Sequence, residues 1–307
     1  MVQKNIFQRL AMPLPELEQY YREQRRIRFE YDEPFRGVKL RKTLHPILVC
    51  GLKLMHLVNG QKITVLGDKR TPTDRPVIFA ATHIGWDDIE MIFTAIRDHA
   101  YLFWGDPRES YKTIDGMLLD LNGAVICDTD NKTDRYIGKE TCVRWLEQGG
   151  NLLIFPEGVW NTSENLPVQY LFPGTAEMAI RTNADIIPVA ISQFGKEYRV
   201  NIGANISCNG FCLSQKQALT NYLRDAMATL KWEIYETQSL TKRNSIPDNY
   251  AMEYKQIFLD QAQGVYTWEF FVNTAYRPKN ITTSDEAFIH LDQLIPCREN
   301  AFLFRKI

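Results

Sequence analysis

Short apolar runs alternate with amphipathic segments through the middle of this 307-residue chain. Most of the apolar runs have the composition of strands buried in a sheet. The predicted strands occupy residues 63–67, 77–81, 101–105, 123–127, 152–155, 186–191 and 198–207. Segments with helical spacing lie between them, at residues 89–93, 114–121, 133–148 and 174–182. This alternation predicts an α/β fold with a mostly parallel central sheet flanked by helices.

The two ends of the chain have a different, helical pattern, so the sequence predicts three parts. Residues 1–60 form an N-terminal helical segment, 61–245 the α/β domain, and 246–307 a C-terminal helical and aromatic extension. Two C-terminal helices are predicted. The first spans residues 214–240, with an apolar stripe that helps to cover the sheet, and the second spans 248–262. From residue 266 onwards the chain is rich in aromatic residues but carries no motif that indicates a role.

The apolar stretch at residues 44–58 is interrupted by Lys53 and follows a basic segment. It is too short to cross a bilayer, which takes about 20 apolar residues. A basic flank before an apolar helix is typical of a segment that lies in the membrane interface. The alternative is a buried helix beside a solvated charged face. The basic residues are Arg25, Arg26, Arg28, Arg36, Lys39, Arg41 and Lys42.

Composition and charge exclude several classes of protein. The formal net charge is −1 and the isoelectric point is about 6.5, so no overall positive field favours nucleic acid. The six cysteines are scattered, and Cys208 and Cys212 lack the partner pair or nearby histidines of a zinc site. Residues 1–10 are too polar for a secretory signal. We therefore expect reduced thiols and a cytoplasmic protein with no metal site.

Candidate chemistry follows the predicted strand at 77–81. His83 and Asp88 are five residues apart, which on a continuous helix would put them on different faces. A break at Gly85 would let the histidine fold back onto the aspartate. A carboxylate that holds an imidazole leaves its second nitrogen able to accept a proton, so the pair would act as a general base. The alternative is an ordinary strand-end histidine beside an aspartate, Asp87 or Asp88, that caps the next helix.

A second motif, Leu152–Gly158, again joins a buried strand to a tight turn. With it the chain resembles the glycerophospholipid acyltransferase superfamily, which includes the 1-acylglycerol-3-phosphate acyltransferases. The resemblance covers residues 75–205 and rests on four sequence blocks in the right order. The first is His83 with four residues before Asp88; the others are Gly123–Cys127, Phe155–Gly158 and Ile187–Val189.

The resemblance implies transfer of a fatty acyl group from acyl-CoA or acyl carrier protein to a hydroxyl of a lysophospholipid-like acceptor. No permanently bound cofactor is implied. Glu157 would help to hold the acceptor, and the turn at Gly158 would offer backbone N–H groups to the oxyanion. His83 would deprotonate the acceptor for direct attack, because no serine or cysteine stands beside it. Such an enzyme takes its acceptor from the bilayer, so we expect peripheral binding at the inner face of the membrane.

The chain departs from the family pattern where a phosphate would bind. Thr129 stands where the second block usually has arginine, and Val159 and Trp160 replace the usual threonine and arginine of the third. None of them supplies the paired charged donors of an arginine fork. Either a nearby cation substitutes, or the acceptor lacks a phosphate there and Trp160 stacks on an apolar or sugar-like group. The candidate cations are Arg108, Lys132 and Arg135.

Two other functions stay open from the sequence. An inactive lipid-binding relative would keep the fold and lose the phosphate clamp. A metal-dependent hydrolase would use side chains around the first block. Its ligands would be His83, Asp87, Asp88 and Glu90. The chain has only five histidines, and the four besides His83 lie in unrelated contexts. Such a site would therefore have few histidine ligands for a metal.

Overall fold

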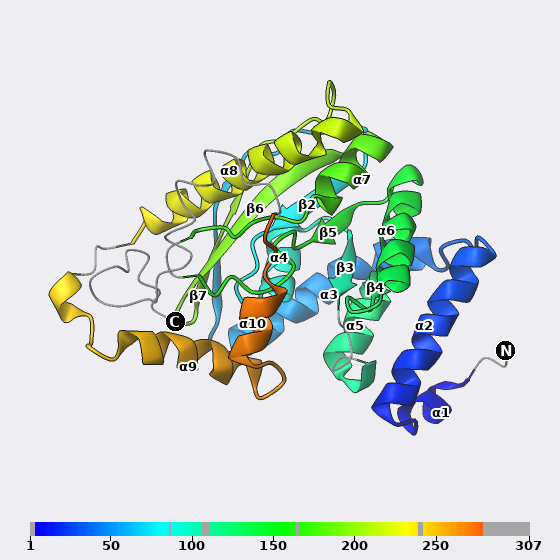
Figure 1. The fold of residues 1–307 in the computed structure, drawn as a ribbon, viewed down its shortest axis with the longest axis horizontal. Coiled ribbons are helices and arrows are strands. Elements are labelled where there is room, and N and C mark those ends of the chain that lie inside the picture. The colour runs from blue at the N-terminus through cyan, green and yellow to red at the C-terminus, as the bar shows by residue number, and fades with distance from the viewer. Residues whose placement is uncertain (1–3, 86, 106–110, 164–165, 239–241, 279–307) are drawn as a thin grey trace.

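A computed structural model describes residues 4–85, 87–105, 111–163, 166–238 and 242–278. The described residues form a seven-stranded sheet in the order β1-β7-β6-β2-β5-β3-β4 (Figure 1). The strands are β1 Lys62–Asp68, β2 Val77–Ala81, β3 Tyr101–Gly105, β4 Ala124–Cys127, β5 Leu152–Ile154, β6 Asp185–Phe194 and β7 Glu197–Ile202. Neighbouring strands are parallel except β6 and β7. The predicted α/β class with a mostly parallel sheet is confirmed.

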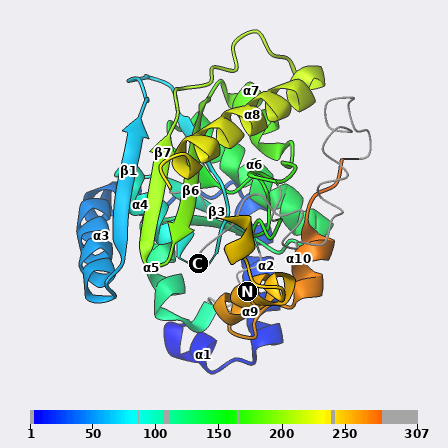
Figure 2. The same ribbon diagram turned by 90° about the vertical axis from the view of Figure 1, so that its left-hand side faces the viewer.

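Helices cover both faces of the sheet (Figures 1 and 2). Further helices form the N-terminal and C-terminal parts of the described chain. They are α1 Ile6–Leu10, α2 Leu14–Glu30, α3 Val38–Val58, α4 Asp88–Ile96, α5 Ile114–Asn122, α6 Lys132–Glu147, α7 Gly174–Thr182, α8 Lys216–Tyr235, α9 Tyr250–Ala262 and α10 Trp268–Thr274. Short 3₁₀ turns lie at Leu213–Gln215 and Arg243–Ser245. Residues 279–307 and Arg108, which the sequence analysis discussed, lie outside the described residues.

Side-chain alternation along β2 divides the core into two layers. Ile78 and Ala80 pack with α6, α7 and α8 on one face of the sheet. Val77, Phe79 and Ala81 pack with α4 on the opposite face, where α3 and α5 add partly buried side chains. All five residues of β2 are buried, as expected for a central strand covered on both sides. The end of β2 is therefore a rigid point from which the following loop begins.

The structure differs from the sequence prediction at several element ends. The predicted strand at 198–207 ends at Ile202, and β6 runs three residues beyond its predicted end, to Phe194. The reason is a tight reversal at Gly195, where φ is +62°, which lets β7 return antiparallel along β6. The predicted N-terminal helical segment, residues 1–60, is broken after Glu30, and Gly37, with φ +70°, precedes α3.

Helix α2 is fixed to α6 by charge pairs. Arg25 contacts Asp134 at 2.6 Å, and Arg22 pairs with Asp128. Asp134 is 1% exposed, so its charge depends on this partner. Arg26 pairs with Glu23 and Glu30 of its own helix. This part of the predicted basic flank is therefore largely neutralised by neighbouring carboxylates.

Helix α3 has one buried side and one exposed apolar side. His45, Val49 and His56 are buried, and the helix packs on α4 and α5. Its other side exposes large apolar residues. They are Leu40, Ile47, Leu54, Leu57 and Val58, each at least 60% exposed. Among the described helices, none is both long and apolar enough to cross a membrane. The predicted interfacial position of this segment stays a prediction.

A pair of histidines, one buried and one partly buried, joins α3 to the loops beneath it. His45 donates from Nδ1 to Asn122 Oδ1 at 2.8 Å, and His99 donates from Nε2 to the Asn122 carbonyl at 2.9 Å. The two imidazole centroids are 5.5 Å apart. Burial lowers the pKa of His99 to about 4, from an ordinary value of 6.5.

We expect the stability of the protein to fall as the pH drops from 6.5 towards 4. In that range the unfolded chain protonates His99 while the folded chain does not, so protons favour unfolding. The His99→Gln variant should show a shallower dependence of the free energy of unfolding on pH. Urea denaturation at several pH values measures this. An unchanged slope in the variant would assign the acid sensitivity to other groups.

Candidate active site

The loop after β2 brings His83 and Asp88 together. His83 Nδ1 lies 2.8 Å from Asp88 Oδ2, and because a carboxylate only accepts, Nδ1 is the protonated nitrogen. The lone pair of Nε2 is then the one able to take a proton. The His83 side chain is 18% exposed and that of Asp88 is fully buried. The sequence predicted this return of the imidazole onto the aspartate, and the geometry agrees.

The Asp88 carboxylate also folds the loop, in a way the sequence analysis did not predict. Its Oδ2 accepts from the backbone N–H of Ile84 at 2.7 Å and of Gly85 at 3.2 Å. Helix α4 begins at Asp88 with Asp87 as N-cap, and neither side chain caps the first turn. The capping role predicted for these aspartates is therefore wrong. The Asp88 side chain points back towards the loop instead. There its Oδ2 accepts from three donors, namely His83 Nδ1 and the N–H groups of Ile84 and Gly85.

Gly85 has no unusual backbone angle, and it lies close to a side chain of the C-terminal extension. Its φ is outside the positive region, and a Cβ there would lie 2.4 Å from Oε1 of Gln261. Gln261 belongs to α9, nearly 180 residues further along the chain. The C-terminal extension thus touches the bend between the histidine and the aspartate.

Asp87 is held by two polar groups beside this bend. Its Oδ2 accepts from Gln61 at 2.7 Å and from the Tyr198 hydroxyl at 2.9 Å. Burial and the nearby carboxylate of Asp87 raise the pKa of Tyr198, so its hydroxyl stays protonated and donates. Gln61 also contacts His56 at the end of α3, with 3.0 Å between Oε1 and Nδ1. The loop is therefore braced from α3 and β7.

Glu157 is fully buried and fixes the main chain of His83. Its Oε1 accepts from the His83 N–H at 2.9 Å, and its Oε2 accepts from the Gln169 N–H at 2.8 Å. The His83 carbonyl accepts from the Asn161 N–H at 2.8 Å. Both main-chain groups of His83 are thus bonded to the segment around the third block. Sequence analysis assigned Glu157 to the acceptor, whereas both of its oxygens here serve backbone N–H groups.

The turn at Gly158 has a left-handed backbone, with φ of +74°. A Cβ at this position would lie 2.5 Å from the Phe172 ring. The Gly158 N–H donates to the Phe155 carbonyl at 3.0 Å, which closes the turn. The predicted use of this N–H for an oxyanion conflicts with that bond. The glycine is needed because no other residue adopts this φ without strain.

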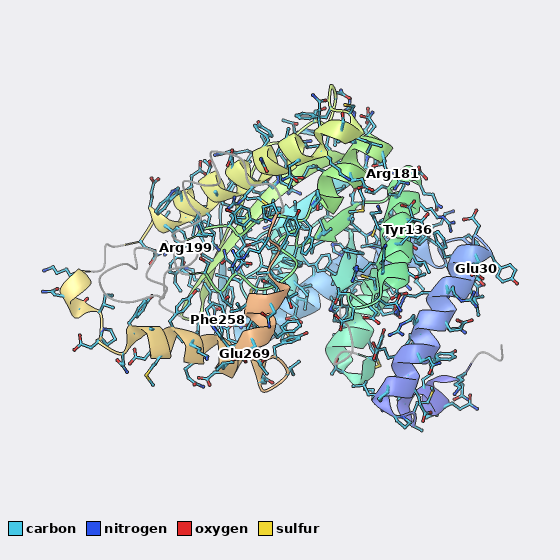
Figure 3. All side chains as sticks on the ribbon, in the orientation of Figure 1. Glu30, Tyr136, Arg181, Arg199, Phe258 and Glu269 are labelled. Carbon is cyan, nitrogen blue, oxygen red and sulfur yellow. The ribbon has the colours of Figure 1, made fainter. Side chains whose placement is uncertain are left out.

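Trp160 lies against His83 but is covered by the C-terminal extension. It is 6% exposed, and its ring stacks on Phe271 at 5.1 Å between centroids. The His83 ring lies 6.4 Å from it, edge to face, and 4.3 Å from Phe155. Phe271 therefore covers one face of the Trp160 ring, which the sequence analysis proposed to stack on a substrate group. Figure 3 labels Phe258 of α9, which belongs to the same aromatic cluster.

Thr129 is not brought to His83. It is exposed and follows β4, which is separated from β2 by β5 and β3. At the usual strand spacing that is about 14 Å across the sheet. Its carbonyl accepts from Arg135, which is exposed, as is Lys132. The side chains that make hydrogen bonds or ring contacts with His83 are instead acidic or aromatic: Phe155, Glu157, Trp160 and Asp88.

A buried lysine beneath the loop was missed by sequence reasoning. Lys231 is 1% exposed on α8 and donates to the Ile191 carbonyl. The Thr82 hydroxyl accepts from the Ile191 N–H at 3.0 Å, directly before His83. The burial of Lys231 could have been predicted from the sequence, because this lysine lies beside Leu230 and four residues after Met227 on the apolar stripe of α8.

One hollow in the described part of the chain lies away from His83. It measures about 620 Å³ and lies between α2 and α6, lined by side chains of both charges and by apolar groups. It includes Tyr20, Arg22, Asn131 and Asp134, and none of the predicted site residues. In the parts of the chain that the structure describes, no three His, Cys, Asp or Glu side chains gather to hold a metal.

Comparison with known proteins identifies a related family and a related fold. Residues 62–192 match the Acyltransferase family, a stretch that contains β1 to β5, most of β6 and the loops around His83 and Glu157. These residues are therefore similar to the Acyltransferase family. The resemblance to the glycerophospholipid acyltransferase superfamily is confirmed for this part.

A solved structure is similar over a wider range. It is the 1-acyl-sn-glycerophosphate (LPA) acyltransferase PlsC from Thermotoga maritima, with a TM-score of 0.55 and 17% sequence identity. The match covers 72% of this chain and 91% of that one. At this identity the likeness establishes the fold. The comparison with curated proteins found no match.

Proposed function

We propose that the protein transfers a fatty acyl group from an acyl thioester to a hydroxyl of a lysophospholipid-like acceptor. The observation that carries the proposal is the 2.8 Å contact between His83 and Asp88, within residues similar to the Acyltransferase family. Asp88 fixes the tautomer and orientation of the ring, and its charge stabilises the imidazolium that forms. The donor is acyl-CoA or acyl carrier protein.

The reaction uses His83 twice. Nε2 takes the proton from the acceptor hydroxyl as its oxygen attacks the thioester carbonyl. When the tetrahedral intermediate collapses, the carbon–sulfur bond breaks and the imidazolium returns the proton to the thiolate. The products are an ester and a free thiol. Attack is direct, since no serine or cysteine contacts His83 among the described residues.

The acceptor group beside Trp160 carries no phosphate in this proposal. Val159 and Trp160 are buried under the C-terminal aromatic cluster, and neither bears a charge. Asp88 and Glu157 add buried carboxylates to the same site. A phosphate dianion at this wall would meet negative charge and apolar rings, with no described arginine in contact with His83. An uncharged hydroxyl-bearing group suits these surroundings better.

Peripheral membrane binding through α3 is the proposed route to the acceptor. Ile47 and Leu54 are 66% and 63% exposed, and Lys39, Lys42 and Lys53 are exposed on the same helix. An apolar side with basic residues matches an anionic lipid surface. On this proposal the protein acts at the cytoplasmic, inner face of the membrane.

Replacing His83 by alanine should lower kcat for acyl transfer about 10²- to 10⁴-fold, because the general base is lost. Asp88→Asn should also lower it, by removing the charge that stabilises the imidazolium. Asp98→Asn is the control, since that exposed carboxylate pairs with Arg70 at another surface. Turnover of labelled acyl-CoA measures the effect. Equal rates for wild type and His83→Ala would favour the inactive lipid-binding relative.

Acceptors without a phosphate on the group next to the hydroxyl should be acylated, and lysophosphatidic acid should be a poor acceptor. The physical reason is the uncharged wall formed by Val159 and Trp160. Purified protein is incubated with labelled acyl-CoA and each acceptor in turn, and the labelled lipid is identified. A product formed only from phosphate-bearing acceptors would refute this choice of acceptor.

Charges placed on the exposed side of α3 should weaken membrane binding. The double variant Ile47→Glu and Leu54→Glu should lower the partition onto vesicles of phosphatidylcholine and phosphatidylglycerol about tenfold or more. Leu213→Glu serves as control, because Leu213 is half exposed on a distant turn. Sedimentation with vesicles measures the partition, and equal loss in both variants would contradict a role specific to α3.

A further inference from the structure

Asp87 stands at the N-cap position of α4 but does not cap the helix. Its side chain makes no hydrogen bond to the first turn, although aspartate is among the preferred N-cap residues. Its backbone is helical, with φ of −85° and ψ of −6°, whereas an N-cap residue ordinarily has an extended backbone. A strong capping residue in a non-capping conformation needs another interaction that holds it there.

Four other helices of this chain show the ordinary arrangement. In each of them the N-cap side chain accepts a hydrogen bond from the first turn, and ψ of the N-cap residue lies between 113° and 170°. These N-cap residues are Asn5, Thr113, Asn131 and Thr267. Because the peptide link between Asp87 and Asp88 is planar, ψ of Asp87 sets the direction in which the chain continues into Asp88. Capping by Asp87 would therefore turn Asp88 away from its present orientation.

Two donors outside α4 hold the Asp87 carboxylate. Both reach the same oxygen, Oδ2, from Gln61 Nε2 at 2.7 Å and from the Tyr198 hydroxyl at 2.9 Å. Tyr198 is 3% exposed in β7, and Gln61 lies between α3 and β1. Helix α4 packs against α3, β1 and β7, so both donors belong to the elements that surround it (Figure 2).

Gln61 is itself fixed to the end of α3. Its backbone N–H donates to the His56 carbonyl at 2.8 Å. Because Nε2 of Gln61 donates to Asp87, its Oε1 is the acceptor for Nδ1 of the buried His56, 3.0 Å away. The amide therefore has one favourable orientation, with its N–H group towards Asp87.

We propose that Asp87 is a positioning residue for the pair of His83 and Asp88. Its carboxylate, held by Gln61 and Tyr198, keeps the start of α4 out of the capping conformation, so that Asp88 stays directed at His83 Nδ1. The inference rests on the proposed function, because the orientation of Asp88 matters for turnover only if His83 is the base. Asp87 acts through hydrogen bonding rather than charge, since both bonds end on one oxygen and a neutral amide oxygen also accepts two.

The test compares Asp87→Ala with Asp87→Asn. Asparagine keeps an oxygen for both donors and removes the charge, whereas alanine removes both. Asp87→Ala should lower kcat about tenfold with little change in KM, because Asp88 no longer holds the imidazole in place. Asp87→Asn should keep kcat within about twofold of wild type. A loss in Asp87→Asn as large as in Asp87→Ala would assign the effect to charge and overturn the proposal, as would unchanged kcat in Asp87→Ala.

Tyr198→Phe is the milder variant, because it removes one donor and leaves the buried ring in place. It should lower kcat about threefold, and the same change in the Asp87→Ala background should cost nothing further. Tyr111→Phe is the control, since the Tyr111 hydroxyl bonds to Arg25 Nη1 of α2 at 3.1 Å. Equal losses in both backgrounds would contradict the proposal. If Asp87→Ala does not fold, Tyr198→Phe must lower kcat where Tyr111→Phe does not.

An NMR signal keeps this test separate from the proposed function. The proton that His83 Nδ1 donates to Asp88 is observed in protein with isotope-labelled histidine and assigned by its loss in His83→Gln. It should exchange with solvent about tenfold faster in Asp87→Ala and Tyr198→Phe, and at the wild-type rate in Asp87→Asn and Tyr111→Phe. Equal exchange in all variants would overturn the proposal even in an active enzyme. Wild-type protein without transferase activity would refute the enzyme, and the exchange rates would still decide whether Asp87 positions Asp88.

Discussion

The buried carboxylate of Glu157 is the interaction on which the site depends. It is fully enclosed and joins its own turn after β5 to the loop after β2 and to the segment at Gln169. A carboxylate tolerates such burial only when hydrogen bonds replace water. Because all of these partners must be in place together, the fold of the sheet and the conformation of the histidine loop are coupled.

The order of the strands explains why these parts meet. β2 lies between β5 and β6, so the loops after β2 and β5 leave the same edge of the sheet side by side. His83 follows the first strand and Glu157 the second. Their separation of 74 residues in sequence becomes a single hydrogen bond in space. Parallel strands joined by helices bring the ends of distant segments together in this way.

The periodic features of the sequence were sufficient to predict the sheet and the contact between His83 and Asp88. Buried runs such as 77–81 and the break near Gly85 are local signals, and local signals can be read from one chain. The partners of Glu157 could not be found that way. Its bonds go to backbone N–H groups, which every residue has, so no residue type marks them. The stacking of Phe271 on Trp160 depends on the path of the C-terminal helices, which no motif records.

The attachment of α2 has a consequence for the way the chain can be divided. Asp134 is 1% exposed and accepts from Arg25 of α2 and from the Asp128 N–H. Removing the first sixty residues would take away the guanidinium and leave an anion facing newly wetted apolar surface on α6. The N-terminal helices thus cover the edge of the sheet near β4, and a recombinant fragment limited to the central fold would leave the Asp134 carboxylate without its guanidinium partner.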